Sequence, residues 1–234
     1  MKQIQAILFC LILLSFSSCD DGRIYPAEEA EEGGGKGSMK VRFHGEGAWP
    51  QEYMLVFAAF GDDNGIPVIS KVIPKPDHSD TPVEMTLNGL DERTKRLSVA
   101  VVNKGRELIY DFYSYPVDDA SKEILLPVTE INLAGYDRIQ KQVFDAYCIR
   151  CHGAGENAAA GLNLMGGHSY ESLVNIKSVL SKDDKLLVNP GQTGRSFLYD
   201  VLKEDIINYN HTDVLPESEL IELISAWITN GAEK

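Results

Sequence analysis

The sequence predicts a multidomain β + α protein, in which an N-terminal β-sandwich is followed by an all-α domain. In residues 39–131 the apolar residues alternate with a period of two, or form short runs between turn residues, as is typical of strands. In residues 132–234 they recur at intervals of three and four, as is typical of helices. Residues 1–38 precede both parts and differ from them in composition.

Residues 1–18 have the features of a lipoprotein-type signal peptide. Lys2 is followed by an apolar run, Ala6 to Leu14, which is shorter than the roughly 20 residues that a transmembrane helix needs. Small residues precede Cys19, which predicts cleavage before this cysteine and its lipidation; ordinary secretory cleavage at the neighbouring serines is the alternative. We therefore expect an exported protein, lipid-anchored in the bacterial cell envelope on its periplasmic or surface face.

Residues 19–38 are rich in acidic residues and glycine, a composition that cannot bury a core and predicts a flexible linker. The β-sandwich is predicted over residues 39–131, where Asn103-Lys104-Gly105 marks a tight hairpin. About seven short strands in this length favour an immunoglobulin-like architecture, without the Cys…Trp…Cys arrangement of true immunoglobulin domains. The runs that predict strands are 39–43, 53–60, 68–73, 83–87, 97–102, 108–113 and 123–128.

Helical spacing begins after Asn132, where Asp137 is a possible cap for a first helix. That helix is indicated by Ile139, Val143, Phe144 and Tyr147. Further helices are predicted over 170–180, 196–203 and 216–229. Pro216 suits the first position of the last helix, and Gly231 suits its end.

Residues 148–152, Cys-Ile-Arg-Cys-His, form the C-x-x-C-H signature of covalent haem attachment. A gap of two residues near the end of one helix lets both thiols reach the two vinyl groups of one porphyrin. The next residue then presents an imidazole to the iron from the same side. We predict one covalent haem c, bound through Cys148 and Cys151, with His152 as the proximal ligand of the haem iron.

Three alternatives to haem attachment can produce a C-x-x-C-H pattern. A thioredoxin-like redox pair also uses C-x-x-C, but in a βαβ context rather than at the end of a helix in an all-α region. A zinc site needs a second pair of ligands, for which only His168 and His211 lie nearby. Chance would produce the pattern on the order of once in several hundred chains of this length.

The chain from about Ile139 to Ala232 resembles the small c-type cytochrome domain of exported bacterial lipoproteins. The resemblance implies a compact cytochrome c-like all-α domain over residues 132–234, with haem on Cys148 and Cys151 and His152 as the proximal ligand. It does not include the β-rich part. The matching stretches are Cys148–Gly153, Ala160–Leu164, Tyr170–Asn175, Val188–Gly191, Ser196–Leu198 and Trp227–Ala232.

The distal side of the iron departs from this family, which usually has a Met-Pro pair shortly before the last helix. Here residues 209–216 contain no Met. We therefore expect His211, in the loop before the closing helix, to be the distal ligand of the haem iron. Met165, His168 and an open sixth position are the alternatives. A bis-His iron would have a lower potential than a His/Met iron.

These features together favour an electron-transfer lipoprotein rather than a catalyst, with a redox protein as its partner and the membrane reached through lipidated Cys19. The net charge of −13 is spread over both halves, so nucleic acid is not expected as a partner, and a basic protein would be attracted at low salt. The alternatives are a haem enzyme or gas sensor with an open distal site, and a binding or adhesion β-sandwich with a structural haem.

Overall fold

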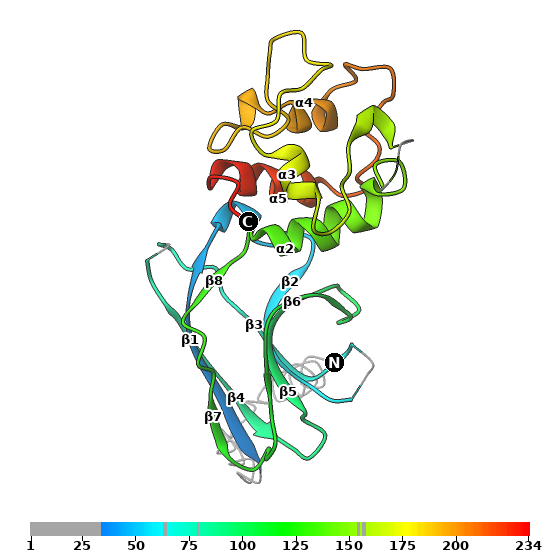
Figure 1. Ribbon diagram of the computed structural model, residues 1–234. Coiled ribbons are helices and arrows are strands. Elements are labelled where there is room, and N and C mark those ends of the chain that lie inside the picture. Colours follow the sequence, from blue (N-terminus) through cyan, green and yellow to red (C-terminus); the bar gives the residue numbers. More distant parts are fainter. Residues whose placement is uncertain (1–33, 63–64, 79, 154, 156–157) are drawn as a thin grey trace, which may run out of the picture. The chain divides into compact units, whose positions relative to one another are not determined.

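The computed structural model describes residues 34–62, 65–78, 80–153, 155 and 158–234, whose helices and strands are labelled in Figure 1. The predicted signal peptide, the lipidation candidate Cys19 and most of the predicted linker lie outside the described residues. Residues 34–234 form one compact unit. Among the described residues, no helix is both long and apolar enough to cross a membrane.

The first sheet is built around strand β1 (Gly35–His44). β4 (Val83–Leu90) is antiparallel to it, whereas β7 (Glu123–Leu125) and β8 (Glu130–Asn132) run parallel to it on the other side. β1 therefore begins inside the segment predicted as linker. Glycine permits this start, because a Cβ at Gly35 would collide with the Ala120 carbonyl oxygen.

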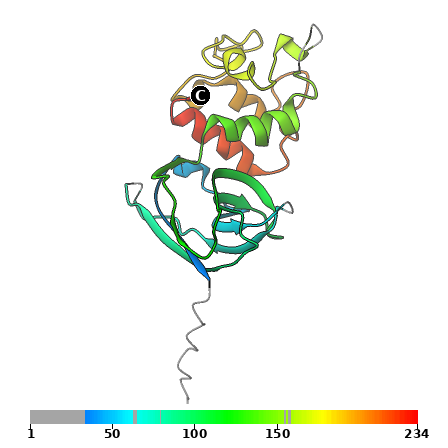
Figure 2. The same cartoon turned by 60° about the horizontal axis from the view of Figure 1, so that its bottom comes forward.

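The second sheet is fully antiparallel, in the order β3 (Pro67–Val72), β2 (Met54–Phe60), β5 (Arg96–Val102) and β6 (Leu108–Pro116). The strands of both sheets can be followed in Figure 1 and Figure 2. Every run that predicted a strand contains a strand of the structure, and β8 is an additional one. A period of two identified β1, whose burial alternates along the strand, whereas continuous apolar runs identified β2 and β5, which are buried on both faces.

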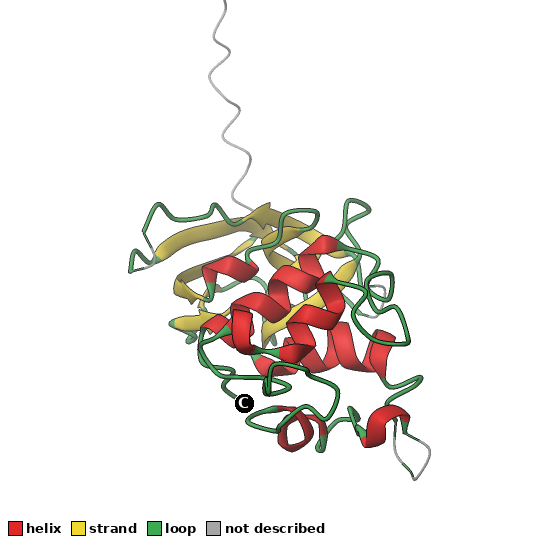
Figure 3. Ribbon diagram, turned by 90° about the horizontal axis from the view of Figure 1, so that it is seen from above, coloured by secondary structure: helices red, strands yellow, loops and turns green. Residues whose placement is uncertain are grey.

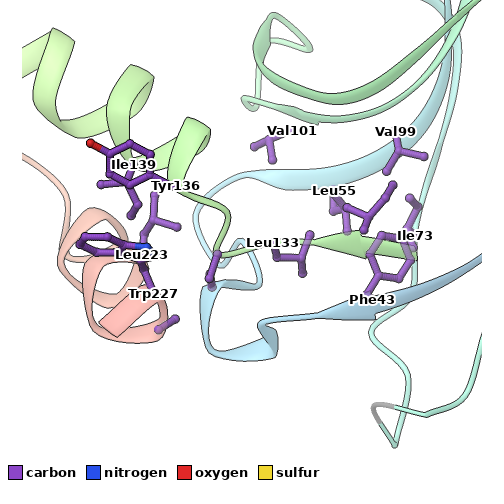
Figure 4. Packing of buried hydrophobic residues seen from close by; sticks show 14 of the residues in the cluster. Phe43, Leu55, Ile73, Val99, Val101, Leu133, Tyr136, Ile139, Leu223 and Trp227 are labelled. Carbon is purple, nitrogen blue, oxygen red and sulfur yellow. The ribbon is translucent and has the colours of Figure 1, made fainter. Parts of the chain in front are cut away.

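The core between the sheets is one hydrophobic cluster that continues among the helices. Phe43 of β1 and Leu55 of β2 belong to it, as do Leu133, Ile139 and Trp227. Figure 4 shows these side chains in a continuous row from the strands to the helices. The strand-rich and helical segments therefore bury apolar surface against each other.

The prediction of an all-α, cytochrome c-like domain over residues 132–234 is wrong. The structure describes four short α-helices, and isolated strand bridges lie between segments that were expected to be helical. Long loops connect the helices, as Figure 3 shows. Its first residue, Asn132, still belongs to β8, which pairs with β1. The helical elements are α2 (Tyr136–Ile139), the π-helix η2 (Gln140–Cys148), the 3₁₀ turns η3 (Ala159–Gly161) and η4 (Thr193–Arg195), α3 (Ser169–Leu173), α4 (Phe197–Lys203) and α5 (Ser218–Thr229); a further 3₁₀ turn, η1 (Glu46–Ala48), lies in the strand-rich part.

The predicted helix over 170–180 shows why the periodicity misled. α3 ends at Leu173, and Val174 forms a parallel bridge with Val188. Asn175 follows with a φ of 61°, a left-handed conformation that stops a helix. Ser178 Oγ then accepts the backbone N–H groups of Leu180 and Ser181, which makes a turn. Pairing with distant segments and local side-chain bonds thus outweighed the apolar spacing.

A buried ion pair joins α2 to α5, and its side chains also bind backbone groups of the strand-rich part. Arg138, at 1% exposure, lies 3.5 Å from Glu219 of α5 and donates to the carbonyl oxygens of Ala48 and Leu133, at 3.0 Å each. Glu219 Oε2 accepts the backbone N–H groups of residues 51 and 52. Burial lowers the pKa of Arg138 to about 10, while the attraction of Glu219 acts in the opposite direction.

Candidate functional site

The C-x-x-C-H motif lies at the carboxyl end of the π-helix η2. The last bond of this helix runs from the Ile149 N–H to the Phe144 carbonyl at 3.0 Å, a span of five residues. The N–H groups of Cys151 and His152 then both donate to the Cys148 carbonyl, at 3.1 and 2.9 Å. The motif therefore turns tightly, with both cysteines and His152 gathered around one carbonyl.

Residues 158–164, called the loop below, follow the motif and hold the imidazole of His152. Its Nδ1 lies 2.9 Å from the Ala159 carbonyl oxygen. A carbonyl only accepts, so Nδ1 carries the hydrogen and Nε2 keeps a free lone pair. Burial lowers the pKa of His152, as does the neighbouring His211, whereas the Ala159 hydrogen bond raises it.

His211 lies beside His152, although it comes from the loop before α5. The centroids of the two rings are 6.2 Å apart and their planes differ by 28°. His211 is held in the same way as His152, because its Nδ1 lies 2.9 Å from the Tyr209 carbonyl oxygen. The Tyr209 ring packs against it edge-on, with centroids 5.0 Å apart. Two imidazoles that each have Nδ1 within hydrogen-bond distance of a backbone carbonyl thus lie side by side.

Both cysteines of the motif are free thiols. Cys148 is partly buried and Cys151 is exposed. Burial, with a smaller contribution from the charge of Cys151, raises the pKa of Cys148 to about 12. In redox-active C-x-x-C pairs the nucleophilic cysteine has a lowered pKa, commonly at a helix N-terminus. Cys148 has the opposite shift and lies at the opposite end of a helix.

The other predicted ligands are placed differently. His168 precedes α3 and, in the part of the chain that the structure describes, forms no ring pair with His152. Met165 is 40% exposed, and its N–H donates to Asn163 Oδ1. Among the described residues, no three His, Cys, Asp and Glu side chains are arranged to hold a metal ion. A structural zinc site, which uses four such ligands, is therefore not seen there.

Sequence reasoning missed the groups that orient the two histidines. The acceptors on Ala159 and Tyr209 are backbone carbonyls, which leave no signal in a sequence. Gln140 did leave a signal, because it shares the spacing of Val143, Phe144 and Tyr147 and is a polar residue on an apolar face. A buried amide needs partners, so this position marks a polar network.

Comparison with known proteins found no matching family model, no matching curated protein and no matching solved structure. The functional assignment therefore rests on the residues of this chain.

Proposed function

We propose that this chain binds one haem c covalently through Cys148 and Cys151, with His152 and His211 as the two axial ligands of the iron, and that it transfers electrons. The observation that carries the proposal is the histidine pair. The centroids of the two imidazole rings, which come from distant segments, lie 6.2 Å apart. The Nδ1 atom of each ring is hydrogen-bonded to a backbone carbonyl. A carbonyl that fixes one ring nitrogen is the usual support of a metal-binding imidazole.

The centroid separation of 6.2 Å is close to that of two imidazoles that share one metal ion, although the stacked rings would have to turn their Nε2 atoms toward each other to bind it. A metal–imidazole bond is about 2 Å long, so two opposed ligand nitrogens would lie about 4 Å apart. Each ring centroid lies about 1 Å behind its nitrogen, which gives a centroid separation of about 6 Å. The thiols fit as well, since Cys148 and Cys151 have the spacing for two vinyl groups and are not joined to each other.

The same thiols argue against a dithiol oxidoreductase. A thiol whose pKa is about 12 is almost fully protonated at neutral pH, so Cys148 would be a poor nucleophile for disulfide exchange. Attachment to haem suits these cysteines better, because a specialised attachment system promotes that reaction outside the cytoplasm.

Bound haem would supply a one-electron couple of iron. The residues of the chain would set the conditions for it: the cysteines keep the group in place, and the carbonyls of Ala159 and Tyr209 orient the two imidazoles. If both histidines bound the iron, they would leave no position for a substrate, which would favour electron transfer over catalysis. Two imidazoles also favour a lower potential than a His/Met pair.

The cellular setting belongs to the same proposal. The predicted signal peptide and Cys19 imply export and lipid anchoring in the cell envelope, where haem attachment takes place. The partner would be a redox protein of that compartment.

Haem staining of a denaturing gel tests the attachment. The full chain is produced with and without a haem-attachment system, beside a Cys148→Ala/Cys151→Ala variant. We expect stain and an added mass of one haem only for the wild type made with the system. Colourless wild-type protein of unmodified mass would refute the proposal.

His211→Ala tests the distal ligand, with His168→Ala as the matched control. We expect the His211 variant to bind carbon monoxide rapidly and fully when reduced, and the wild type and the control to resist it. Equal resistance in all three proteins would remove His211 as a ligand. Rapid binding by the wild type would indicate an open site, as in a haem enzyme or gas sensor.

A further inference from the structure

The side chain of Gln140 is buried and fully hydrogen-bonded at the start of η2. It is 8% exposed. Its Oε1 accepts from the Tyr136 hydroxyl, at 3.2 Å, and from Ser169 Oγ. Its Nε2 donates to Asp145 Oδ1 at 2.7 Å and to the Leu164 carbonyl at 3.0 Å. Both amide hydrogens and the amide oxygen therefore have partners, which a polar group at this depth requires.

Leu164 connects this amide to the motif. Its carbonyl accepts from Gln140, and its N–H donates to the His152 carbonyl at 2.7 Å. The same loop also holds His152 through Ala159, whose carbonyl binds Nδ1 and whose N–H donates to Cys151. The loop thus binds the backbone and the ring of His152, and Gln140 ties the loop to the helix that carries the motif.

We propose that Gln140 is a positioning residue for His152, because its amide fixes Leu164 and through it the loop that orients the imidazole. The inference rests on the proposed role of His152 as an iron ligand. An apolar side chain at position 140 would fill the same space, but it would leave the Leu164 carbonyl, 2% exposed as a residue, without this donor. The loop would then be free to shift relative to His152.

Two measurements on the full chain test the proposal. In chain made without the attachment system, amide hydrogen exchange at Leu164 is compared with that at Val99 of β5, and ¹⁵N spectra report the protonated ring nitrogen of His152. In haem-loaded chain, the reduction potential and the ferric spectrum are recorded. The variants are Gln140→Met, which removes all four bonds, and Gln140→Glu, which keeps an acceptor oxygen but replaces the amide donor to Leu164 and Asp145 with a carboxyl oxygen.

Tyr136→Phe is the control, because it removes the bonds of the Tyr136 hydroxyl to Gln140 Oε1 and Ser169 Oγ and leaves the bond between Gln140 and Leu164 intact. We expect both Gln140 variants to speed exchange at Leu164 roughly tenfold relative to Val99, as the loss of one buried hydrogen bond implies. His152 should lose its single-tautomer signal, and the potential should shift. The control should stay within about twofold. If Gln140→Met does not fold, Gln140→Glu decides.

The outcomes separate the two proposals. Colourless protein would refute the haem assignment, whereas the exchange measurement on unloaded chain would still report on Gln140. Unchanged Leu164 exchange with an unchanged His152 signal would overturn the role of Gln140 even in a haem-loaded protein. Equal changes in Tyr136→Phe would also overturn it, since they would assign the effect to general packing.

Discussion

Arg138→Met tests whether the strand-rich part and the helices unfold as one unit. The substitution keeps much of the side-chain volume but removes the charge from a site with 1% exposure. The Ala48 and Leu133 carbonyls then lose their donor, and Glu219, with its side chain 6% exposed, loses its cation. Removal of one partner of a buried pair costs about 3–5 kcal/mol.

Glu219 would still accept two backbone N–H groups in the variant, so its charge would not be left without partners. We therefore expect the free energy of unfolding to fall by about 3 kcal/mol, the lower end of this range. In a domain of this size the melting temperature should fall by roughly 6–12 °C. Urea unfolding of the full chain is followed by circular dichroism and tryptophan fluorescence. Arg93→Met is the control, because the Arg93 side chain is 70% exposed and water screens its pair with Asp91, which should therefore contribute little to stability.

The reasoning fails if Arg138→Met costs no more than Arg93→Met. It also fails if the wild type unfolds in two separate steps, with the sheets and the helices melting independently. A single transition for both probes is expected, because one hydrophobic cluster includes residues of the sheets and of the helices.

Three further predictions concern stability. Gly35→Ala should destabilise the fold by about 1–3 kcal/mol, because the added Cβ would collide with a backbone carbonyl. Gly166→Ala is the control and should cost less, since a Cβ there would meet open space. Urea titrations of the two variants make the comparison. Trp227→Ala should cost about 3–5 kcal/mol in the same assay, since the ring is 1% exposed in the core. Burial raises the pKa of Asp111, although the attraction of Arg96 acts in the opposite direction. The charged carboxylate therefore destabilises the fold when the pH is above this raised pKa. The destabilisation disappears as the pH falls below the pKa and the carboxyl group becomes protonated. Asp111→Asn should therefore be more stable than wild type near pH 7, with a difference that shrinks toward pH 4; a difference independent of pH would contradict this.

Much of the strand-rich part was predictable because its signals are local. Asn103-Lys104-Gly105 lies between β5 and β6 as expected, and alternation together with short apolar runs located the strands. Which strands pair was not predictable, since β1 lies beside β7 and β8 in parallel through contacts that span most of that part. Helix lengths after Asn132 were overestimated, because apolar spacing does not register the bridges that replaced helix beyond Leu173.

The sequence by itself determined the chemistry that one short segment can carry. Cys148, Cys151 and His152 are neighbours in the chain, so their geometry follows from a single helix end and needs no distant contact. Only the tertiary structure decided that His211 lies beside His152 and that Gln140 reaches Leu164. Each of these pairs joins residues that are far apart in the sequence. Backbone carbonyls and packing position the side chains of the pairs, and neither can be read from the identity of adjacent residues.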